Sequence, residues 1–218
     1  WETIEGYLQR AGFQIHQPLV RNQDSISKMA EFVLKEVDGS FILGGLSMGG
    51  YICFEIWRQA PERVQAMILC DTDHRLDTPE RRKAREQMMC LVEKGKFNQM
   101  AALFHRTLTS QDYLNDEEKS KKLMEMIYRT PSEEYLRQQN AIFNRPDSSD
   151  TLATIECPTL LLCGEFDLKT PPAVHEEMAS KIPSAQLDII SGAGHLPTLE
   201  AGDTVGPLIR DWLLRLED

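Results

Sequence analysis

The chain has 218 residues, of which 41% are hydrophobic and 27% charged, fractions typical of a globular protein that exclude a disordered or fibrous chain. Its 34 acidic and 24 basic residues give a net charge of −10, which argues against a protein that binds nucleic-acid phosphates. No apolar run approaches the roughly 20 residues that a membrane helix needs, and no segment resembles a signal peptide. We therefore expect a cytoplasmic protein that binds neither nucleic acid nor membrane, whose oligomeric state stays open.

The first third of the chain alternates between helical and strand-like patterns. Helices are predicted over residues 1–9, 25–37 and 48–60, and apolar strands over residues 13–20, 41–44 and 64–71. Asp24 or Ser25 is expected to cap the second helix. Strands that are continuously apolar and alternate with helices indicate a mostly parallel sheet with helices on both faces.

Residues 74–150 differ in character, because they contain no convincing strand and are dense in charge. Thr78 and Thr130 each precede a proline, a pattern that places threonine at a helix N-cap and proline at the first helical position. The charged stretch 81–86 is expected to form a solvated helix face. An inserted helical lid is the natural interpretation of this segment.

Strand-like and helical patterns alternate again in the last third of the chain. Strands are predicted over residues 158–163 and 186–190, and helices over residues 172–182 and 204–216. The sequence thus predicts an α/β core of residues 1–73 and 151–218 that carries a helical lid of residues 74–150.

Cysteines and histidines are scattered along the chain. The five cysteines, an odd number without C-x-x-C spacing, are typical of buried thiols in a reducing compartment. The five histidines do not cluster either, so we expect no metal site and no cofactor. His74 and His105 are expected on solvated helix faces, and His175 at the surface.

The segment with a candidate catalytic motif joins the strand at 41–44 to the helix at 48–60. It reads Gly45-Leu46-Ser47-Met48-Gly49, a G-x-S-x-G pattern between a strand and a helix. A sharp turn there would strain Ser47 and project its hydroxyl, while Gly45 and Gly49 must be small so that strand and helix close up. The Met48 N–H opens the helix and is free to hold an oxyanion, so Met48 and Leu46 are candidate oxyanion- and substrate-binding residues. A phosphate loop or a plain structural turn are the alternatives, although neither G-x-G-x-x-G nor GK[ST] is present.

A base and an orienting acid follow the last two predicted strands. Asp167 comes directly after the strand at 158–163, and His195 lies in a glycine-rich loop after the strand at 186–190. Carboxyl ends of parallel strands are where open α/β sheets gather their active sites. Taken singly, Asp167 suits a structural turn and His195 a structural loop, and Asp71 or Asp73 offers an alternative position for the acid.

Three segments together resemble the α/β-hydrolase superfamily: GLSMGG at 45–50, CPTLLLCGEFDLKTPP at 157–172 and GAGHLPTLE at 192–200. The resemblance is to its cap-bearing branch, which includes pimeloyl carrier-protein methyl ester esterase, 3-oxoadipate enol-lactonase and carbon–carbon bond hydrolases. It implies Ser47 as nucleophile, His195 as general base and acid, and Asp167 as the carboxylate that orients His195. It also implies earlier strands and a second oxyanion N–H, which we expect in a segment before Trp1.

The activity implied by the resemblance is that of a cofactor-free serine hydrolase, which cleaves a small carboxylic ester through an acyl-enzyme. Lactone opening, carbon–carbon cleavage and acyl transfer are alternatives that use the same three residues. A non-catalytic ligand-binding member of the fold is an alternative of another class. A purely structural role fits least, because it leaves Ser47, Asp167 and His195 unexplained.

Overall fold

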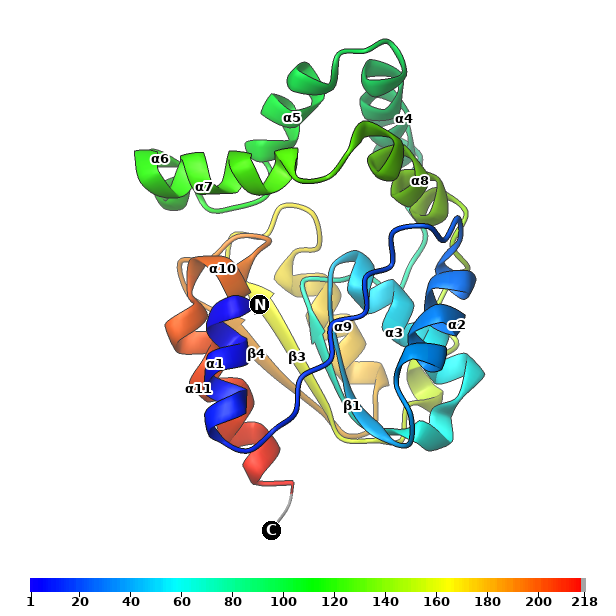
Figure 1. The fold of residues 1–218 in the computed structure, drawn as a ribbon. Coiled ribbons are helices and arrows are strands. Elements are labelled where there is room, and N and C mark those ends of the chain that lie inside the picture. The colour runs from blue at the N-terminus through cyan, green and yellow to red at the C-terminus, as the bar shows by residue number, and fades with distance from the viewer. Residues whose placement is uncertain (217–218) are drawn as a thin grey trace.

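The computed structural model describes residues 1–216, and a four-stranded parallel sheet forms its centre (Figure 1). The strands are β1 (Phe41–Leu46), β2 (Val64–Cys70), β3 (Thr159–Gly164) and β4 (Ala185–Ile190), in the spatial order β1-β2-β3-β4. Leu46 lies beside Cys70 and Cys70 beside Leu162, so neighbouring strands end close together. Because all strands run in one direction, the residues that follow them meet at one edge of the sheet.

Apolar side chains cover both faces of this sheet, as its continuously apolar strands require. One face packs against α2 (Ile26–Glu36), α3 (Met48–Gln59) and α9 (Pro172–Lys181). The other packs against α1 (Glu2–Arg10) and α11 (Gly202–Leu214). The predicted α/β fold, a parallel sheet with helices on both faces, is confirmed.

Five helices between β2 and β3 lie beyond the carboxyl edge of the sheet (Figure 1). They are α4 (Pro79–Glu93), α5 (Phe97–His105), α6 (Gln111–Asn115), α7 (Glu117–Tyr128) and α8 (Ser132–Phe143). Thr78 caps α4 as predicted, because its side chain accepts a hydrogen bond from the Arg81 N–H at 3.3 Å. Thr130 does not cap α8: its N–H still donates to the Ile127 carbonyl at the end of α7, at 3.2 Å, and Pro131 takes the cap position.

Shorter elements complete the described part of the chain. The 3₁₀ turns are η1 (Pro61–Arg63) and η2 (Leu152–Thr154), and α10 (Pro197–Glu200) precedes α11. Four of the five free cysteines are buried, and Cys90 is partly exposed. No helix within residues 1–216 combines the length and the apolar character that crossing a membrane takes.

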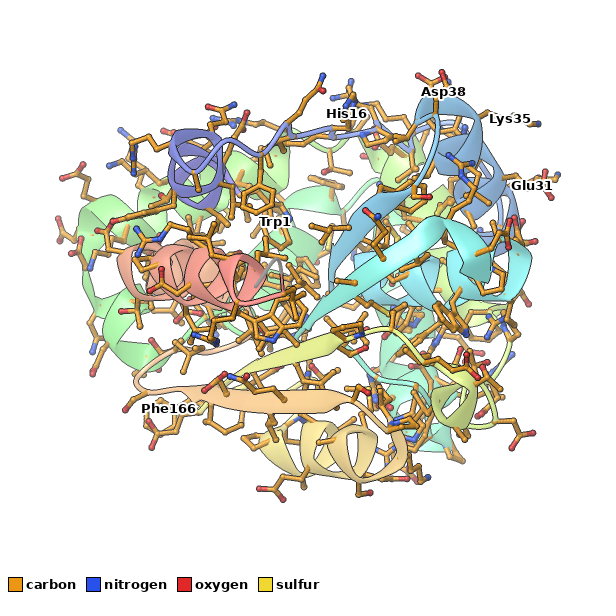
Figure 2. The ribbon with its side chains drawn as sticks, turned by 90° about the horizontal axis from the view of Figure 1, so that it is seen from below. Trp1, His16, Glu31, Lys35, Asp38 and Phe166 are labelled. Carbon is orange, nitrogen blue, oxygen red and sulfur yellow. The ribbon has the colours of Figure 1, made fainter. Side chains whose placement is uncertain are left out.

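The strand prediction for residues 13–20 is wrong. This extended segment joins no strand within the described residues; it runs from α1 to α2 past the β1 edge of the sheet, with His16 exposed (Figure 2). Phe13 packs against the apolar cluster on one face and Val20 against the cluster on the other. Pro18 also lacks the N–H that a strand ladder needs. The segment is apolar because it contacts two cores, not because it lies in the sheet.

Candidate active site

Ser47 occupies the turn between β1 and α3. Its φ of 53° lies in the left-handed region that residues other than glycine rarely adopt. Two hydrogen bonds hold this strained backbone: the Ser47 N–H donates to the Cys70 carbonyl at 2.9 Å, and Thr72 Oγ1 donates to the Ser47 carbonyl at 2.8 Å. The Ser47 side chain makes no capping bond to α3, so its hydroxyl is left for another partner.

Two glycines allow this turn to form, and only one of them was predicted. A Cβ on Gly45 would lie 2.4 Å from the Gly49 backbone, so strand and helix approach as expected. A Cβ on Gly49 itself would meet no heavy atom within 4 Å, so the predicted steric need at this position is wrong. The steric requirement for glycine falls on Gly50 instead, because a Cβ there would lie 2.3 Å from the Thr72 hydroxyl.

The Ser47 hydroxyl meets His195, and His195 in turn meets Asp167. Ser47 Oγ lies 2.9 Å from His195 Nε2, and His195 Nδ1 lies 2.8 Å from Asp167 Oδ2. Because a carboxylate only accepts, the Nδ1 proton is donated to Asp167 and Nε2 is left to accept from the Ser47 hydroxyl. Three residues that are 148 and 28 positions apart thus form one hydrogen-bonded row at the sheet edge.

Asp167 is held in its ionised form. Burial by itself would raise the pKa of Asp167, but hydrogen bonds from His195 and Thr170 and the charge of His195 outweigh burial and hold the pKa well below its usual range. Thr170 Oγ1 donates to Oδ2 at 2.6 Å, and the Lys169 N–H donates to Oδ1 at 2.7 Å. An ionised, fully bonded carboxylate fixes the orientation of the imidazole.

Residues 22–201 match the model of the family described as the alpha/beta hydrolase fold. The chain belongs to the α/β-hydrolase family. The predicted resemblance is therefore confirmed at the level of family and fold.

Solved structures and curated proteins agree with this assignment. The chain is 31% identical to a thermophilic esterase from Thermogutta terrifontis, solved with malate bound; the match covers 100% of this chain and 85% of that one, with a TM-score of 0.88. An enol-lactonase from Burkholderia xenovorans shares the fold at 24% identity and a TM-score of 0.79, over 87% of this chain and 73% of the lactonase. The pimeloyl-[acyl-carrier protein] methyl ester esterase of Nitrosomonas europaea is 25% identical over 186 residues, which are 81% of this chain and 72% of the esterase.

A second carboxyl group lies beside Asp167 in this α/β hydrolase. Asp71 follows β2, is fully buried and has a φ of 43°. Its Oδ1 accepts from the Gly164 N–H at 2.9 Å, whereas Oδ2 has no partner among the described residues. Burial, and after it the charge of Asp167, raises the pKa of Asp71 to about 10 against the effect of the Gly164 bond. The imidazole bonds to Asp167, so Asp71 does not take the position of the orienting acid in this structure.

Asp71 and Asp167 also form a group with Cys163, in which one potential ligand atom of each residue lies within 4.8 Å of the others. Burial raises the pKa of the Cys163 thiol, whose Sγ contacts the Gly164 and Thr170 carbonyls. Both oxygens of Asp167 already accept hydrogen bonds, Oδ2 from His195 and Thr170 and Oδ1 from the Lys169 N–H, and Asp71 Oδ1 accepts from the Gly164 N–H. These carboxyl oxygens are thus engaged by groups of the fold.

Two residues that the sequence analysis misjudged or missed support the Ser47 turn. His175 is fully buried on α9, which corrects its predicted surface position. Its Nε2 accepts from the Thr72 N–H at 3.2 Å, and Thr72 in turn bonds to the Ser47 carbonyl. Burial lowers the pKa of His175 to about 4, so the imidazole is neutral and able to accept. No sequence motif marks this contact, because the two residues are 103 positions apart.

His74 and His105, both predicted on solvated helix faces, also contact other parts of the fold. His74 is buried in the loop after β2, and its Nε2 lies 3.3 Å from Glu177 Oε1. His105 ends α5 half-buried, with Nε2 3.1 Å from the Ser120 carbonyl of α7. The prediction of a solvated helix-face position is therefore wrong for His74, whereas His105 does lie on a helix and is partly exposed.

The charged stretch 81–86 is likewise only partly solvated. Arg81 pairs with the buried Asp73 at 2.7 Å, and Arg85 pairs with the nearly buried Asp77 at 2.8 Å. Burial by itself would raise the pKa of Asp77, but Arg85 and then Arg145 lower it to about 2. These pairs fasten α4 to the loop that follows β2.

Glu200, in the segment GAGHLPTLE, holds the loop of His195 on both sides. Its Oε1 accepts from the Gly194 N–H at 2.9 Å and from the Leu196 N–H at 3.2 Å, and its Oε2 accepts from the Ser110 N–H at 2.7 Å. Ser110 belongs to the α5–α6 loop, so one carboxylate joins the His195 loop to the inserted helices. A Cβ on Gly194 would lie 2.5 Å from Ser110 N, which shows how closely the two loops approach.

The two remaining predicted residues flank Ser47. Met48 is the first residue of α3, and its N–H has no hydrogen-bond acceptor within residues 1–216. Leu46 ends β1 and packs partly against the apolar cluster beneath α1 and α11. The Met48 N–H is thus free to donate beside Ser47, and substrate contacts of Met48 and Leu46 stay predictions.

Proposed function

We propose that this α/β hydrolase is a serine hydrolase that cleaves a small carboxylic ester without a cofactor. The observation that carries the proposal is the hydrogen-bonded row of Ser47, His195 and Asp167, with contacts of 2.9 and 2.8 Å. The names of its relatives support ester hydrolysis, since two of those described above are esterases. A small ester or related acyl compound is accordingly the partner that we propose.

The mechanism follows from the donors and acceptors of the row. His195 Nε2 takes the hydroxyl proton as Ser47 Oγ attacks the ester carbonyl, and the charged imidazole is stabilised by Asp167. The Met48 N–H donates to the oxyanion of the tetrahedral intermediate. His195 then protonates the leaving alcohol, and the acyl group stays on Ser47. In the second half, His195 activates a water molecule that releases the acid.

The inserted helices serve in this proposal as a lid over the reacting groups. Residues 74–150 form the lid, and residues 1–73 and 151–218, of which 217–218 lie outside the described residues, form the core that carries Ser47, Asp167 and His195. The contact between Glu200 and Ser110 supports this division, because it links the loop of the base directly to the lid.

The decisive test replaces the nucleophile. Ser47→Ala should lower kcat on short p-nitrophenyl esters by about 10⁴-fold or more, because attack by the hydroxyl is lost while binding remains. A fluorophosphonate probe should label the unchanged protein and not the variant. The exposed Ser40 provides the matched control: Ser40→Ala should keep both activity and labelling.

Urea unfolding accompanies the assay, so that lost activity is not lost folding. If Ser47→Ala keeps most of the activity while folded, Ser47 is not the nucleophile and the proposal is wrong. If the unchanged protein neither hydrolyses esters nor reacts with the probe, the result favours the alternative, a non-catalytic ligand-binding member of the family.

A further inference from the structure

Lys169 occupies the loop that carries Asp167, two residues further along the chain. Its backbone N–H donates to Asp167 Oδ1 at 2.7 Å, which fixes the start of its side chain beside the His195–Asp167 pair. Its ammonium lies 4.8 Å from the centre of the Phe104 ring, on helix α5 of the proposed lid. The charged end of Lys169 therefore lies between the loop after β3 and the lid.

This ammonium has no ion-pair partner among the described residues. Among residues 1–216, no carboxylate oxygen lies within 4.0 Å of Lys169 Nζ, and no acceptor takes a hydrogen bond from it. Its side chain is only partly exposed, so water does not fully replace a partner. A cation withdrawn from water without an anion is unfavourable, and proteins usually pair such groups.

The charged side chains near Lys169 leave an excess of positive charge around its ammonium. Arg81 and Arg85 of α4 also act on Lys169, but both are engaged by acidic side chains. Asp77 is shared by Arg81, Arg85 and Arg145, so its negative charge is already more than balanced. Burial, and next the charge of Arg85, lowers the pKa of Lys169 to about 8, against the attraction of Asp167. The ammonium is still mostly protonated at pH 7, in a region with excess positive charge.

Apolar side chains connect this cation to the reacting groups. Leu196 directly follows His195, and it packs in the same apolar cluster as Phe104. The neighbour of the base and the side chain that contacts the ammonium thus belong to one apolar cluster. Apolar side chains in this position suit a short methylene chain with an ester at one end and an anion at the other.

We propose that Lys169 binds a carboxylate of the substrate, so that this enzyme prefers the monoester of a dicarboxylic acid to a neutral ester of the same length. The inference rests on the proposed ester hydrolysis and adds the class of acyl group to it. The ester carbonyl would lie at Ser47, the methylene chain along Leu196 and Phe104, and the free carboxylate against the ammonium of Lys169.

The test compares monomethyl and dimethyl esters of dicarboxylic acids from succinate to adipate, with methanol release at pH 7 as the readout. The unchanged enzyme should show a higher kcat/KM on the monoester of the best chain length. Lys169→Met keeps the length of the side chain but removes its charge, and it should lower the monoester/diester ratio of kcat/KM by about 10- to 100-fold. Lys169→Arg should keep most of the preference, because the charge remains.

Lys83→Met is the matched control, since Lys83 is exposed on α4 and has no ion-pair partner among the described residues. It should leave the ratio unchanged. If the unchanged enzyme does not favour the monoester, or if Lys169→Met lowers both activities equally, the carboxylate subsite is refuted while ester hydrolysis stands. If monoesters, diesters and simple alkyl esters are all left intact, the proposed function fails, and this inference fails with it.

Discussion

Replacing Asp71 by asparagine tests the buried carboxyl next to Asp167. The pKa of Asp71 is raised to about 10, whereas an aspartate in the unfolded chain titrates near 3.8. Between these values the folded protein holds one proton more than the unfolded chain, so its stability falls as the pH rises. Asparagine has the shape of the protonated acid, can still accept from the Gly164 N–H, and does not titrate.

The magnitude follows from the same two pKa values. Each pH unit in the window changes the free energy of unfolding by about 1.4 kcal/mol, because one proton is released on unfolding. At pH 7 the ionisation of Asp71 in the unfolded chain therefore lowers the free energy of unfolding by about 4 kcal/mol at most. The stability of Asp71→Asn relative to the unchanged protein should accordingly grow by about 4 kcal/mol between pH 5 and pH 8.

Urea unfolding, followed by tryptophan fluorescence at several pH values, measures this difference. The control is Asp38→Asn, because Asp38 lies exposed in the turn before β1 (Figure 2) and should give the same difference at every pH. Parallel pH profiles for Asp71→Asn and the unchanged protein would refute the reasoning. The variant should also keep the proposed esterase activity, since His195 bonds to Asp167; loss of activity in a folded Asp71→Asn would instead make Asp71 the functional acid.

Substitutions at Gly50 and Glu200, with Gly49→Ala as a comparison, test the supports of the reacting groups. Gly50→Ala should destabilise the fold by about 1–3 kcal/mol, because the new methyl group would lie 2.3 Å from the Thr72 hydroxyl, whereas Gly49→Ala meets no atom within 4 Å and should be neutral or slightly stabilising. Urea unfolding measures both, and the opposite order contradicts the packing described for the turn. Glu200→Gln leaves one oxygen for three backbone donors and should lower kcat and the rate of fluorophosphonate labelling by about 10-fold or more, with a smaller change in KM. If only the unfolding free energy changes, and kcat per folded molecule does not, Glu200 has no role in positioning His195.

The parts of this fold that follow local rules were predictable from the sequence. Strands β1 to β4 are short apolar runs between helical patterns, and Ser25 caps α2 through the Lys28 N–H as expected. Ser47, Asp167 and His195 were predictable as a group, because parallel strands bring the residues at their carboxyl ends together whatever their separation in sequence.

The supports of the site were not predictable, because they depend on contacts across elements. Residues 13–20 have the composition of a strand, and only the location of the two cores shows that they form a connection. His175 and Thr72 meet through the packing of α9 against the sheet, which no spacing rule encodes. Glu200 had a weak local signal, as an acidic residue in the first turn of α10, but its bond to Ser110 spans 90 positions.

The hydrogen bonds of Glu200 to the N–H groups of Ser110 and Gly194 restrict which segments of the inserted helices can be exchanged to change substrate specificity. Helices α7 and α8 make no hydrogen bond to the His195 loop among the described residues, so segments exchanged there leave the bonds of Glu200 in place. The α5–α6 corner is different, because a transplanted segment without a backbone N–H at position 110 loses the hydrogen bond that joins Glu200 to the inserted helices. Chimaeras with segments from other hydrolases should therefore be joined so that this corner stays native.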